Sequence, residues 1–248
     1  MFKKFYNSYL AYVLVYTFYF LSFALFSSLI SVYMLGLGFS AGQTSVVVSV
    51  AFFASMLAQP VMGILNDRLS IKKVTLFSFG AIIFIAIYFM QVRDLLGLTI
   101  GYSLVVMLIN GVNPVMDVLA ARSPYTYGKI RIWGTIGYAL GSQLAGVLYQ
   151  YVSPMAIFIA FIGAMIITIV GVLSIKIRSE SPKSDEAPKT KKDSYISQIL
   201  TNKTYLYYLL IVALFSVVGN AGHTYIPARL KIFVCVVGMA THLYEISF

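Results

Sequence analysis

Residues 6–66 read YNSYLAYVLVYTFYFLSFALFSSLISVYMLGLGFSAGQTSVVVSVAFFASMLAQPVMGILN and contain no charged side chain. A helix needs about 20 apolar residues to cross a bilayer core of about 30 Å, so this stretch is long enough for more than one crossing. Its middle, from Gly36 to Gly42, carries the glycines and the serine that favour a turn. The stretch therefore predicts two membrane-spanning helices, at about 8–34 and about 42–64.

The remainder of the chain has the same character. Charged residues make up 10% of the sequence, against roughly 25% in a soluble domain, and hydrophobic residues make up 60%. Further apolar spans are expected at about 73–91, 96–119, 131–150, 154–176 and 204–227, with Pro154 suited to the first turn of its helix. The predicted fold class is all-α: a polytopic membrane bundle of six helices followed by a seventh.

The cationic residues predict the orientation of this bundle. Fifteen of them fall before the first span or in alternate connections, on one side of the membrane; up to the seventh span, the other side has only Arg93. The fifteen are Lys3, Lys4, Arg68, Lys72, Lys73, Arg122, Lys129, Arg131, Lys176, Arg178, Lys183, Lys189, Lys191, Lys192 and Lys203. Short basic connections face the cytoplasm, so we expect a multi-pass plasma-membrane protein, surrounded by lipid, with a cytoplasmic N-terminus. The net charge of +10 then reflects topology rather than nucleic-acid binding.

Composition also predicts the domain organisation. The segment Ser179–Ser194 is rich in serine, proline, lysine and acids, which cannot bury enough apolar area to fold. We expect a six-helix bundle over 1–176, a cytoplasmic linker over 177–203, a transmembrane helix over 204–227 and a divergent tail over 228–248. The tail is interpreted as the product of a truncated or frameshifted reading frame.

Two connections carry polar residues in specific patterns. The first reads Gly63-Ile-Leu-Asn-Asp67-Arg68-Leu-Ser-Ile-Lys72-Lys73. Its glycine lets one helix approach a neighbour closely, and its acid is suited to interact with a helix N-terminus and with nearby cations. A plain basic loop with one acid is the alternative reading.

The second pattern places an acid inside an apolar span. Asp117 follows Asn113 and Pro114, and Arg131 opens the next span. A charged side chain within a membrane helix costs about 2.5–3.5 kcal/mol on insertion scales, so it is expected to have a partner and a function. A short helical hairpin brings Asp117 and Arg131 together. The pair contacts a substrate or proton, or it is a structural ion pair, or both residues lie at the cytoplasmic rim. Small residues at helix-packing spacing follow at Gly134, Gly137 and Gly141.

Both patterns resemble transporters of the major facilitator type. The first matches the family's loop signature G-x-L-x-D-R-x-x-x-[KR]-[KR]. Residues 127–141, YGKIRIWGTIGYALG, resemble helix 5 of the lactose-permease branch, which comprises oligosaccharide and nucleoside proton symporters. Six helices before a long loop are half of that family's twelve-helix design. The resemblance covers roughly residues 8–227.

The resemblance implies roles for individual residues. Asp117, Arg131, Asn113 and Trp133 become substrate-binding candidates, Trp133 by stacking on a sugar or base, with an interfacial anchor as its alternative. Gly63, Asp67, Arg68, Lys72 and Lys73 become a cytoplasmic gating loop. The implied function is secondary active transport, as proton-coupled symport of a small polar solute: a sugar, oligosaccharide or nucleoside. It would require a partner half; the alternative is an inactive truncated product.

Little in the sequence indicates other chemistry. His223 titrates near neutral pH and is a candidate proton relay, or simply a hydrogen-bonding residue near a helix end. The chain shows no catalytic constellation, so we do not expect an enzyme, a cofactor or a metal site. The 19 tyrosines and 18 phenylalanines are expected to face lipid or to form interfacial belts.

Overall fold

The computed structural model describes residues 6–175 and 203–216. The chain divides into two units, Met1–Arg178 and Ser179–Phe248. Within the described part of the first unit every regular element is helical: α2 (Tyr9–Ser27), α3 (Ile30–Gly36), α4 (Ala41–Arg68), α5 (Ile71–Gln91), α6 (Leu95–Ala121), α7 (Tyr127–Tyr151) and α8 (Pro154–Ser174). In the second unit the described residues form one helix, Lys203–Ser216. Residues 177–202 of the predicted linker, residues 217–227 of the seventh span, which include His223, and the tail lie outside the described residues.

Helix starts follow local capping chemistry. The side chains of Ser8, Ser70, Asp94 and Ser153 accept a hydrogen bond from a backbone N–H in the first turn of α2, α5, α6 and α8, respectively. Ser40 and Gln43 form a reciprocal capping box at the start of α4. These caps satisfy donors that a helix leaves unpaired at its N-terminus. Pro154 occupies the first turn of α8, as predicted.

The first predicted span is broken into two helices. α2 ends at Ser27 and α3 begins at Ile30, because Leu29 leaves the helical region of backbone space. The Ser27 hydroxyl donates to the Phe23 carbonyl, and such back-bonding to the preceding turn often bends a helix. The predicted turn between the first two spans is confirmed, with Gly38 at a φ of +93°, where residues other than glycine are rarely stable.

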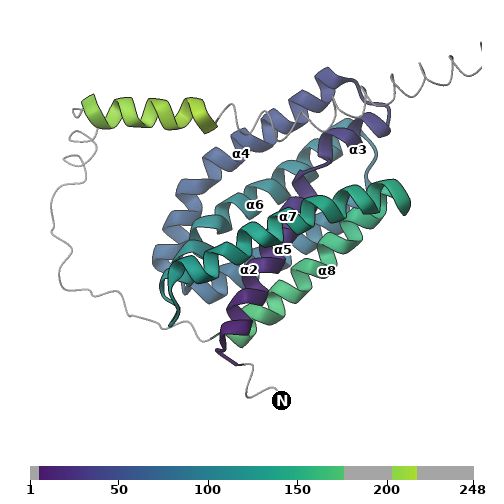
Figure 1. Cartoon of the computed structure of the whole chain (residues 1–248). Coiled ribbons are helices and arrows are strands. Elements are labelled where there is room, and N and C mark those ends of the chain that lie inside the picture. The colour runs from purple at the N-terminus through teal and green to yellow at the C-terminus, as the bar shows by residue number, and fades with distance from the viewer. Residues whose placement is uncertain (1–5, 176–202, 217–248) are drawn as a thin grey trace, which may run out of the picture. The chain divides into compact units, whose positions relative to one another are not determined.

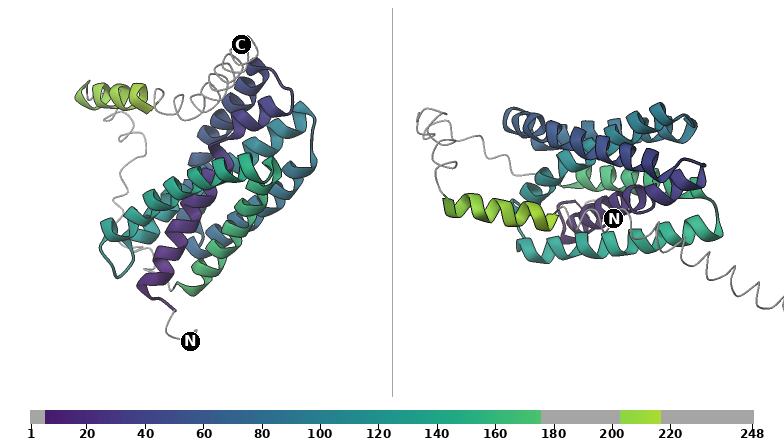
Figure 2. Two further views of the ribbon diagram at one scale, coloured as in Figure 1. Left: turned by 45° about the vertical axis from the view of Figure 1, so that its right-hand side comes forward. Right: turned by 90° about the horizontal axis from the view of Figure 1, so that it is seen from above.

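Helices α2–α8 pack into one bundle, shown in Figures 1 and 2. α2 packs against α7 and α8, α4 packs mainly against α6, and α5 joins α6 to α8. An aromatic cluster closes the interior: the Phe26 ring lies 4.9–5.8 Å from the rings of Phe89, Tyr102, Phe158 and Phe161.

The expectation that aromatic residues mostly face lipid is wrong for the interior of this bundle. Tyr12, Tyr16 and Tyr19 on α2 are buried, and so are Tyr33 on α3 and Tyr102 on α6. A tyrosine ring supplies a large apolar surface, and its hydroxyl can reach a polar group across a helix interface. Composition alone does not distinguish tyrosines buried between helices from tyrosines that lie at the membrane interface.

One end of the bundle gathers the starts of α2, α5 and α7 with the end of α8. The Tyr9 hydroxyl donates to the Lys129 carbonyl at 3.1 Å, and the backbone N–H of Asn7 donates to the Ser174 carbonyl at 2.8 Å. Lys72 Nζ donates to the carbonyls of Leu173 and Ile175, each at 3.0 Å. Within the first unit, the described cations of the basic connections therefore lie at this one end.

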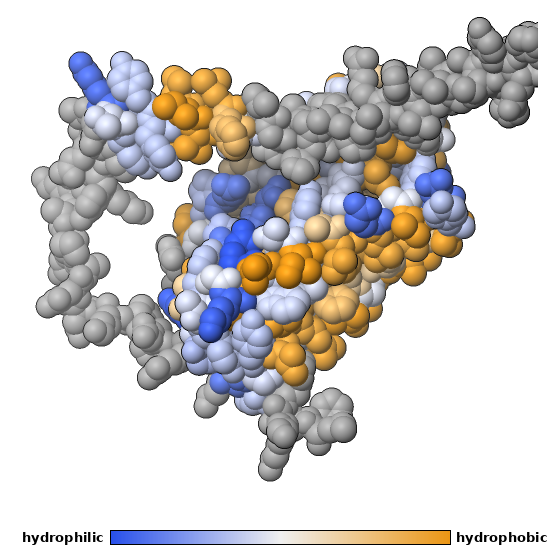
Figure 3. All heavy atoms as spheres, viewed as in Figure 1, coloured by the Kyte–Doolittle hydropathy of each residue, from blue (hydrophilic) through white to orange (hydrophobic). Residues whose placement is uncertain are grey.

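Five of the described helices are long and apolar enough to cross a membrane, counting α2 and α3 together as Tyr9–Gly36. α7 was also predicted to span, but it falls outside this set because its glycine, tyrosine, glutamine and serine positions lower its mean hydropathy. Figure 3 shows hydrophilic residues near the end where α7 begins and again toward its far end, with hydrophobic surface between them and over α8.

Glycines allow α7 to lie directly against α2. A side-chain carbon at Gly137 would collide with the Thr17 backbone, and one at Gly141 would approach the Leu21 carbonyl oxygen at 2.5 Å. This close approach confirms the helix-packing prediction for the α7 glycines. By contrast, a side-chain carbon at Gly146, on the same helix, would meet no atom within 4 Å.

These two glycines should respond oppositely to alanine. Gly137→Ala should lower the free energy of unfolding by about 1–3 kcal/mol, because the added carbon forces α2 and α7 apart. Gly146→Ala should raise it by about 0.5–1 kcal/mol, because alanine favours the helix over glycine. Thermal unfolding of the two purified variants in detergent measures both effects. Equal shifts in the same direction would contradict the close packing of α2 on α7.

Candidate functional site

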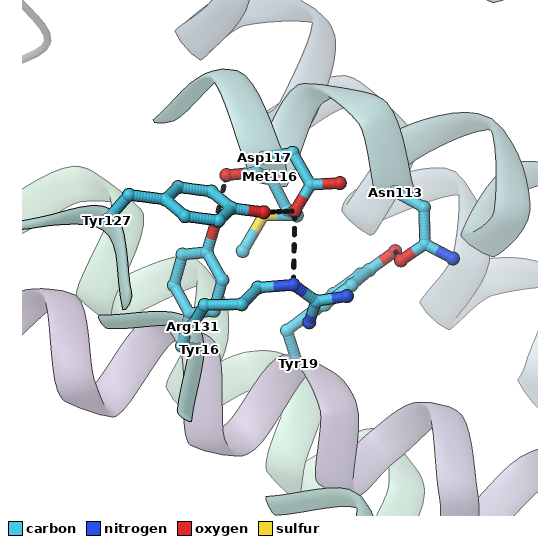
Figure 4. Close-up of polar contacts among 7 residues, drawn as sticks. All are labelled: Tyr16, Tyr19, Asn113, Met116, Asp117, Tyr127 and Arg131. Carbon is cyan, nitrogen blue, oxygen red and sulfur yellow. Dashed lines mark hydrogen bonds and ion pairs between the residues drawn. The ribbon is translucent and has the colours of Figure 1, made fainter. Parts of the chain in front are cut away.

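The candidate site is an ion pair between α6 and α7. Arg131 Nε lies 3.3 Å from Asp117 Oδ1, and the two side chains are 39% and 46% exposed. Figure 4 shows Arg131 reaching from α7 toward the carboxylate on α6. The predicted proximity of these two residues is confirmed, because the short connection between the helices turns their facing ends toward each other.

Two further side chains hold the pair in place. The Tyr127 hydroxyl donates to Asp117 Oδ1 at 3.1 Å, so one carboxylate oxygen receives both a hydroxyl and a guanidinium. The guanidinium carbon of Arg131 lies 4.7 Å from the centre of the Phe20 ring on α2. A cation over an aromatic face is stabilised by about 0.5–2 kcal/mol, depending on exposure. The neighbouring Gly134 has no side chain, which leaves room for Phe20 and Arg131.

Buried tyrosines on α2 fix the helix that carries the acid. The Tyr19 hydroxyl donates to the Ile109 carbonyl at 2.8 Å, and it lies 3.2 Å from Asn113 Oδ1. The Tyr16 hydroxyl donates to the Met116 carbonyl, one residue before Asp117. Figure 4 shows both tyrosines on the α2 side of the site. Sequence reasoning missed these residues, although their spacing of three places them on one face of a helix.

Asn113 lies one turn from Asp117 along α6 and is half-buried. Its amide oxygen meets the Tyr19 hydroxyl, and Pro114 interrupts the helical hydrogen bonds beside it. Proline has no N–H to donate to the carbonyl four residues earlier, which is that of Asn110. The Asn110 side chain donates to Ser55 Oγ at 3.2 Å and so links α6 to α4. A line of polar groups thus follows one side of α6 toward Asp117.

Trp133 takes part in a different contact from the one expected of it. Its ring nitrogen donates to the Tyr9 hydroxyl at 2.9 Å, and the partly buried ring packs against the apolar core. Residues two apart on a helix point roughly 200° apart, so Trp133 does not share the direction of Arg131. The structure brings Asp117, Arg131 and Asn113 together, and it directs Trp133 to Tyr9.

The connection between α4 and α5 shows separate roles for its residues. Lys72 donates to the last carbonyls of α8, where a cation is favourable because those carbonyls have no helical partner. Lys73 is exposed, and a side-chain carbon at Gly63 would meet no atom within 4 Å, so the close helix approach expected there is absent within the described residues. The side chains of Asp67 and Arg68 lie outside the described part. The described residues hold no group of three or more potential metal ligands.

Comparison with known sequences gives matches over most of the chain. The chain matches the MFS_1 like family over residues 9–244. It is 26% identical to the sucrose permease of Escherichia coli over 226 residues, which cover 85% of this chain and 54% of that protein. It is 26% identical to the lactose permease of Citrobacter freundii over 157 residues, which cover 58% of this chain and 37% of that protein. The chain therefore spans about half the length, or less, of the curated relatives it matches.

Comparison with known structures gives the same architecture. A crystal structure of the nucleoside transporter NupG superimposes with a TM-score of 0.69 at 16% sequence identity, over 87% of this chain and 57% of that one. At this identity the likeness shows the fold alone. The predicted helical membrane fold is confirmed by this match and by the apolar helices described above.

The exposure of the ion pair predicts a small contribution to stability. Asp117→Asn should lower the free energy of unfolding by less than about 1 kcal/mol, because half-exposed ion pairs contribute little. Tyr19→Phe should lower it by about 1–3 kcal/mol, because a buried carbonyl and amide lose their partner. Thermal unfolding in detergent compares the two variants. If Asp117→Asn proved the more damaging, the pair would be structural.

Proposed function

Because the chain belongs to the MFS_1 like family, within the major facilitator superfamily, we propose that it forms one bundle of a secondary active transporter for a small polar solute. Residues 9–244 carry the family assignment. The matched relatives are permeases, which agrees with the prediction that the chain is not an enzyme. Their names point to sugars, so a sugar or oligosaccharide is the proposed solute, with a nucleoside as the other candidate from the sequence resemblance.

The observation that supports this proposal is the half-exposed ion pair of Asp117 and Arg131, which joins α6 to α7. Asp117 lies four residues before the end of α6 and Arg131 four residues after the start of α7, and charged groups within membrane helices almost always face a water-filled cavity or another part of the protein. Lipid against this pair would leave two ions without solvent. A solute pathway between this bundle and a second one supplies the water, and transporter sites commonly lie at such an interface. A partner half is therefore part of the proposal.

The site offers both hydrogen-bond donors and hydrogen-bond acceptors. The Asp117 carboxylate accepts, the Arg131 guanidinium donates, and the Asn113 amide does both. Charge-assisted hydrogen bonds are roughly twice as strong as neutral ones, and a guanidinium presents its donors in a fixed plane. Adjacent hydroxyls on a sugar ring supply matching donors and acceptors. We therefore assign these three residues to solute contact.

The connection between α4 and α5 is proposed to act at the cytoplasmic gate. Lys72 anchors this connection to the end of α8. Asp67 and Arg68 are the residues assigned to contact the second bundle, on the basis of the loop signature. Coupling to protons is proposed from the resemblance to the lactose-permease branch.

Uptake into proteoliposomes should test the site directly. In vesicles that contain the chain, Asp117→Asn should weaken apparent solute affinity by about 10- to 100-fold, the effect of losing one charged hydrogen-bond partner. Tyr127→Phe, which keeps the ion pair, should weaken it by about 2- to 10-fold. Lys129→Gln is the control, because it removes an exposed cation near Arg131 without altering the pair. Uptake should fall when a protonophore is added.

Two results would count against this proposal. Unchanged affinity in Asp117→Asn, with normal uptake by the parent chain, would remove the pair from the solute pathway. No uptake by the parent chain, alone or with a partner half, would favour an inactive product.

The basic residues support a cytoplasmic location for the N-terminus and for the connections that follow α4 and α6 in the plasma membrane. In a Cys235→Ser background, Leu96→Cys should react with a membrane-impermeant maleimide on intact cells, because Leu96 is exposed at the opposite end. Leu69→Cys, between α4 and α5, should react only after the cells are permeabilised. Labelling of Leu69→Cys on intact cells would reverse the orientation.

A further inference from the structure

We propose that Tyr9 is a positioning residue for Arg131: it fixes the first turns of α7 on α2 and so holds the guanidinium opposite Asp117. The inference goes beyond solute contact, since Tyr9 belongs to neither motif of the candidate site. It rests on the proposed function only where it treats Arg131 as a solute-binding group.

The start of α7 needs an anchor that its own sequence does not provide. Among α2 and α4–α8, α7 is the one whose N-cap residue, Thr126, makes no side-chain capping hydrogen bond. The N-cap side chains of the other five each accept a hydrogen bond from a backbone N–H in the first turn. These residues are Ser8, Ser40, Ser70, Asp94 and Ser153. Loss of a cap typically costs about 1 kcal/mol of helix stability, so an uncapped end frays more readily. Arg131 lies within two turns of that end.

The Tyr9 hydroxyl supplies this anchor from a different helix. It accepts a hydrogen bond from the Trp133 ring nitrogen at 2.9 Å and lies 3.1 Å from the Lys129 carbonyl, to which it donates. Lys129 and Trp133 lie two residues before and two residues after Arg131. One hydroxyl thus uses its donor and its acceptor on both sides of the arginine.

The Tyr9 ring holds the connection that precedes α7. The Tyr9 and Tyr125 rings form a T-shaped pair with their centroids 5.2 Å apart, and the Tyr12 ring forms another with Tyr125 at 5.8 Å. The Ser123 hydroxyl donates to the Tyr125 carbonyl at 3.0 Å and fixes the turn from inside. Ring and hydroxyl together therefore restrain both the connection and the first turns of α7.

The geometry of the ion pair depends on this restraint. Arg131 Nε is 3.3 Å from Asp117 Oδ1, and its guanidinium carbon is 4.7 Å from the Phe20 ring centre. A shift of α7 by about 1 Å would break a hydrogen bond of that length. Further along α7, contact with α2 is set by Gly137 and Gly141, so Tyr9 acts where the glycine contact has not yet begun.

Trp133 is the chain's single tryptophan, so its spectrum reports this contact without interference. The test compares Tyr9→Phe, which keeps the ring and removes the hydroxyl, with Tyr151→Phe, an exposed tyrosine at the far end of α7. In Tyr9→Phe the indole N–H band in ultraviolet resonance Raman spectra should shift toward weaker hydrogen bonding. Acrylamide should also quench Trp133 emission more strongly. Tyr151→Phe should match the parent chain in both.

A second measurement asks whether Tyr9 acts through Arg131. Tyr9→Phe and Arg131→Gln should lower the Tm by less in combination than the sum of their separate shifts, because each loosens the same contact. Tyr151→Phe and Arg131→Gln should give additive shifts. Neither readout involves solute, so both keep their meaning if Asp117→Asn leaves uptake unchanged and the proposed function fails. An unchanged Trp133 band in Tyr9→Phe, or additive Tm shifts, would overturn the role of Tyr9.

Discussion

Lipid offers no hydrogen bonds, so polar groups buried among these helices must find partners within the protein. Hydroxyls on α2 meet this constraint by reaching carbonyls of its neighbours. Tyr16 and Tyr19 bond to the backbone of α6, and Tyr9 bonds to α7. Among the described residues, the buried hydroxyls of Thr17, Ser31 and Ser103 are the exceptions. The position of α2 in the bundle thus determines where α6 and α7 can lie.

The ion pair of Asp117 and Arg131 meets the same constraint differently. Each charge has the other as a partner, yet both remain partly exposed on the face beside α6 and α7. Full burial would add a desolvation cost that the attraction between the two charges need not offset, and a half-exposed pair contributes little to stability. Partial exposure leaves donor and acceptor positions open to a solute while Tyr127 and Phe20 keep the two side chains oriented. This balance agrees with a binding role within a transporter family.

Much of the fold could be predicted from the sequence because lipid imposes simple rules. Span lengths, the turn at Gly38 and the glycine contacts of α7 follow from apolar length, turn chemistry and side-chain size. The break at Ser27 did not follow, because a serine within an apolar span does not by itself mark a bend. The burial of the α2 tyrosines did not follow, because it depends on neighbours that are distant in sequence. At the site, Asp117 and Arg131 were predicted from an acid in an apolar span. Tyr9 and Tyr16 were missed because many tyrosines occur in this chain and their partners are distant in sequence. Tyr127 opens the stretch that resembles the family, but no role was assigned to it.

The central claim is that the face beside Asp117 borders water while the outer faces border lipid. A nitroxide label placed by Val118→Cys or by Val170→Cys in a Cys235→Ser background tests it in liposomes. Both valines are exposed, and both lie within about one turn of a helix end on the same side of the bundle, so depth is matched. The account predicts that a water-soluble relaxation agent reaches the label at 118, whereas oxygen dissolved in lipid dominates at 170. Lipid-type accessibility at both positions would contradict it.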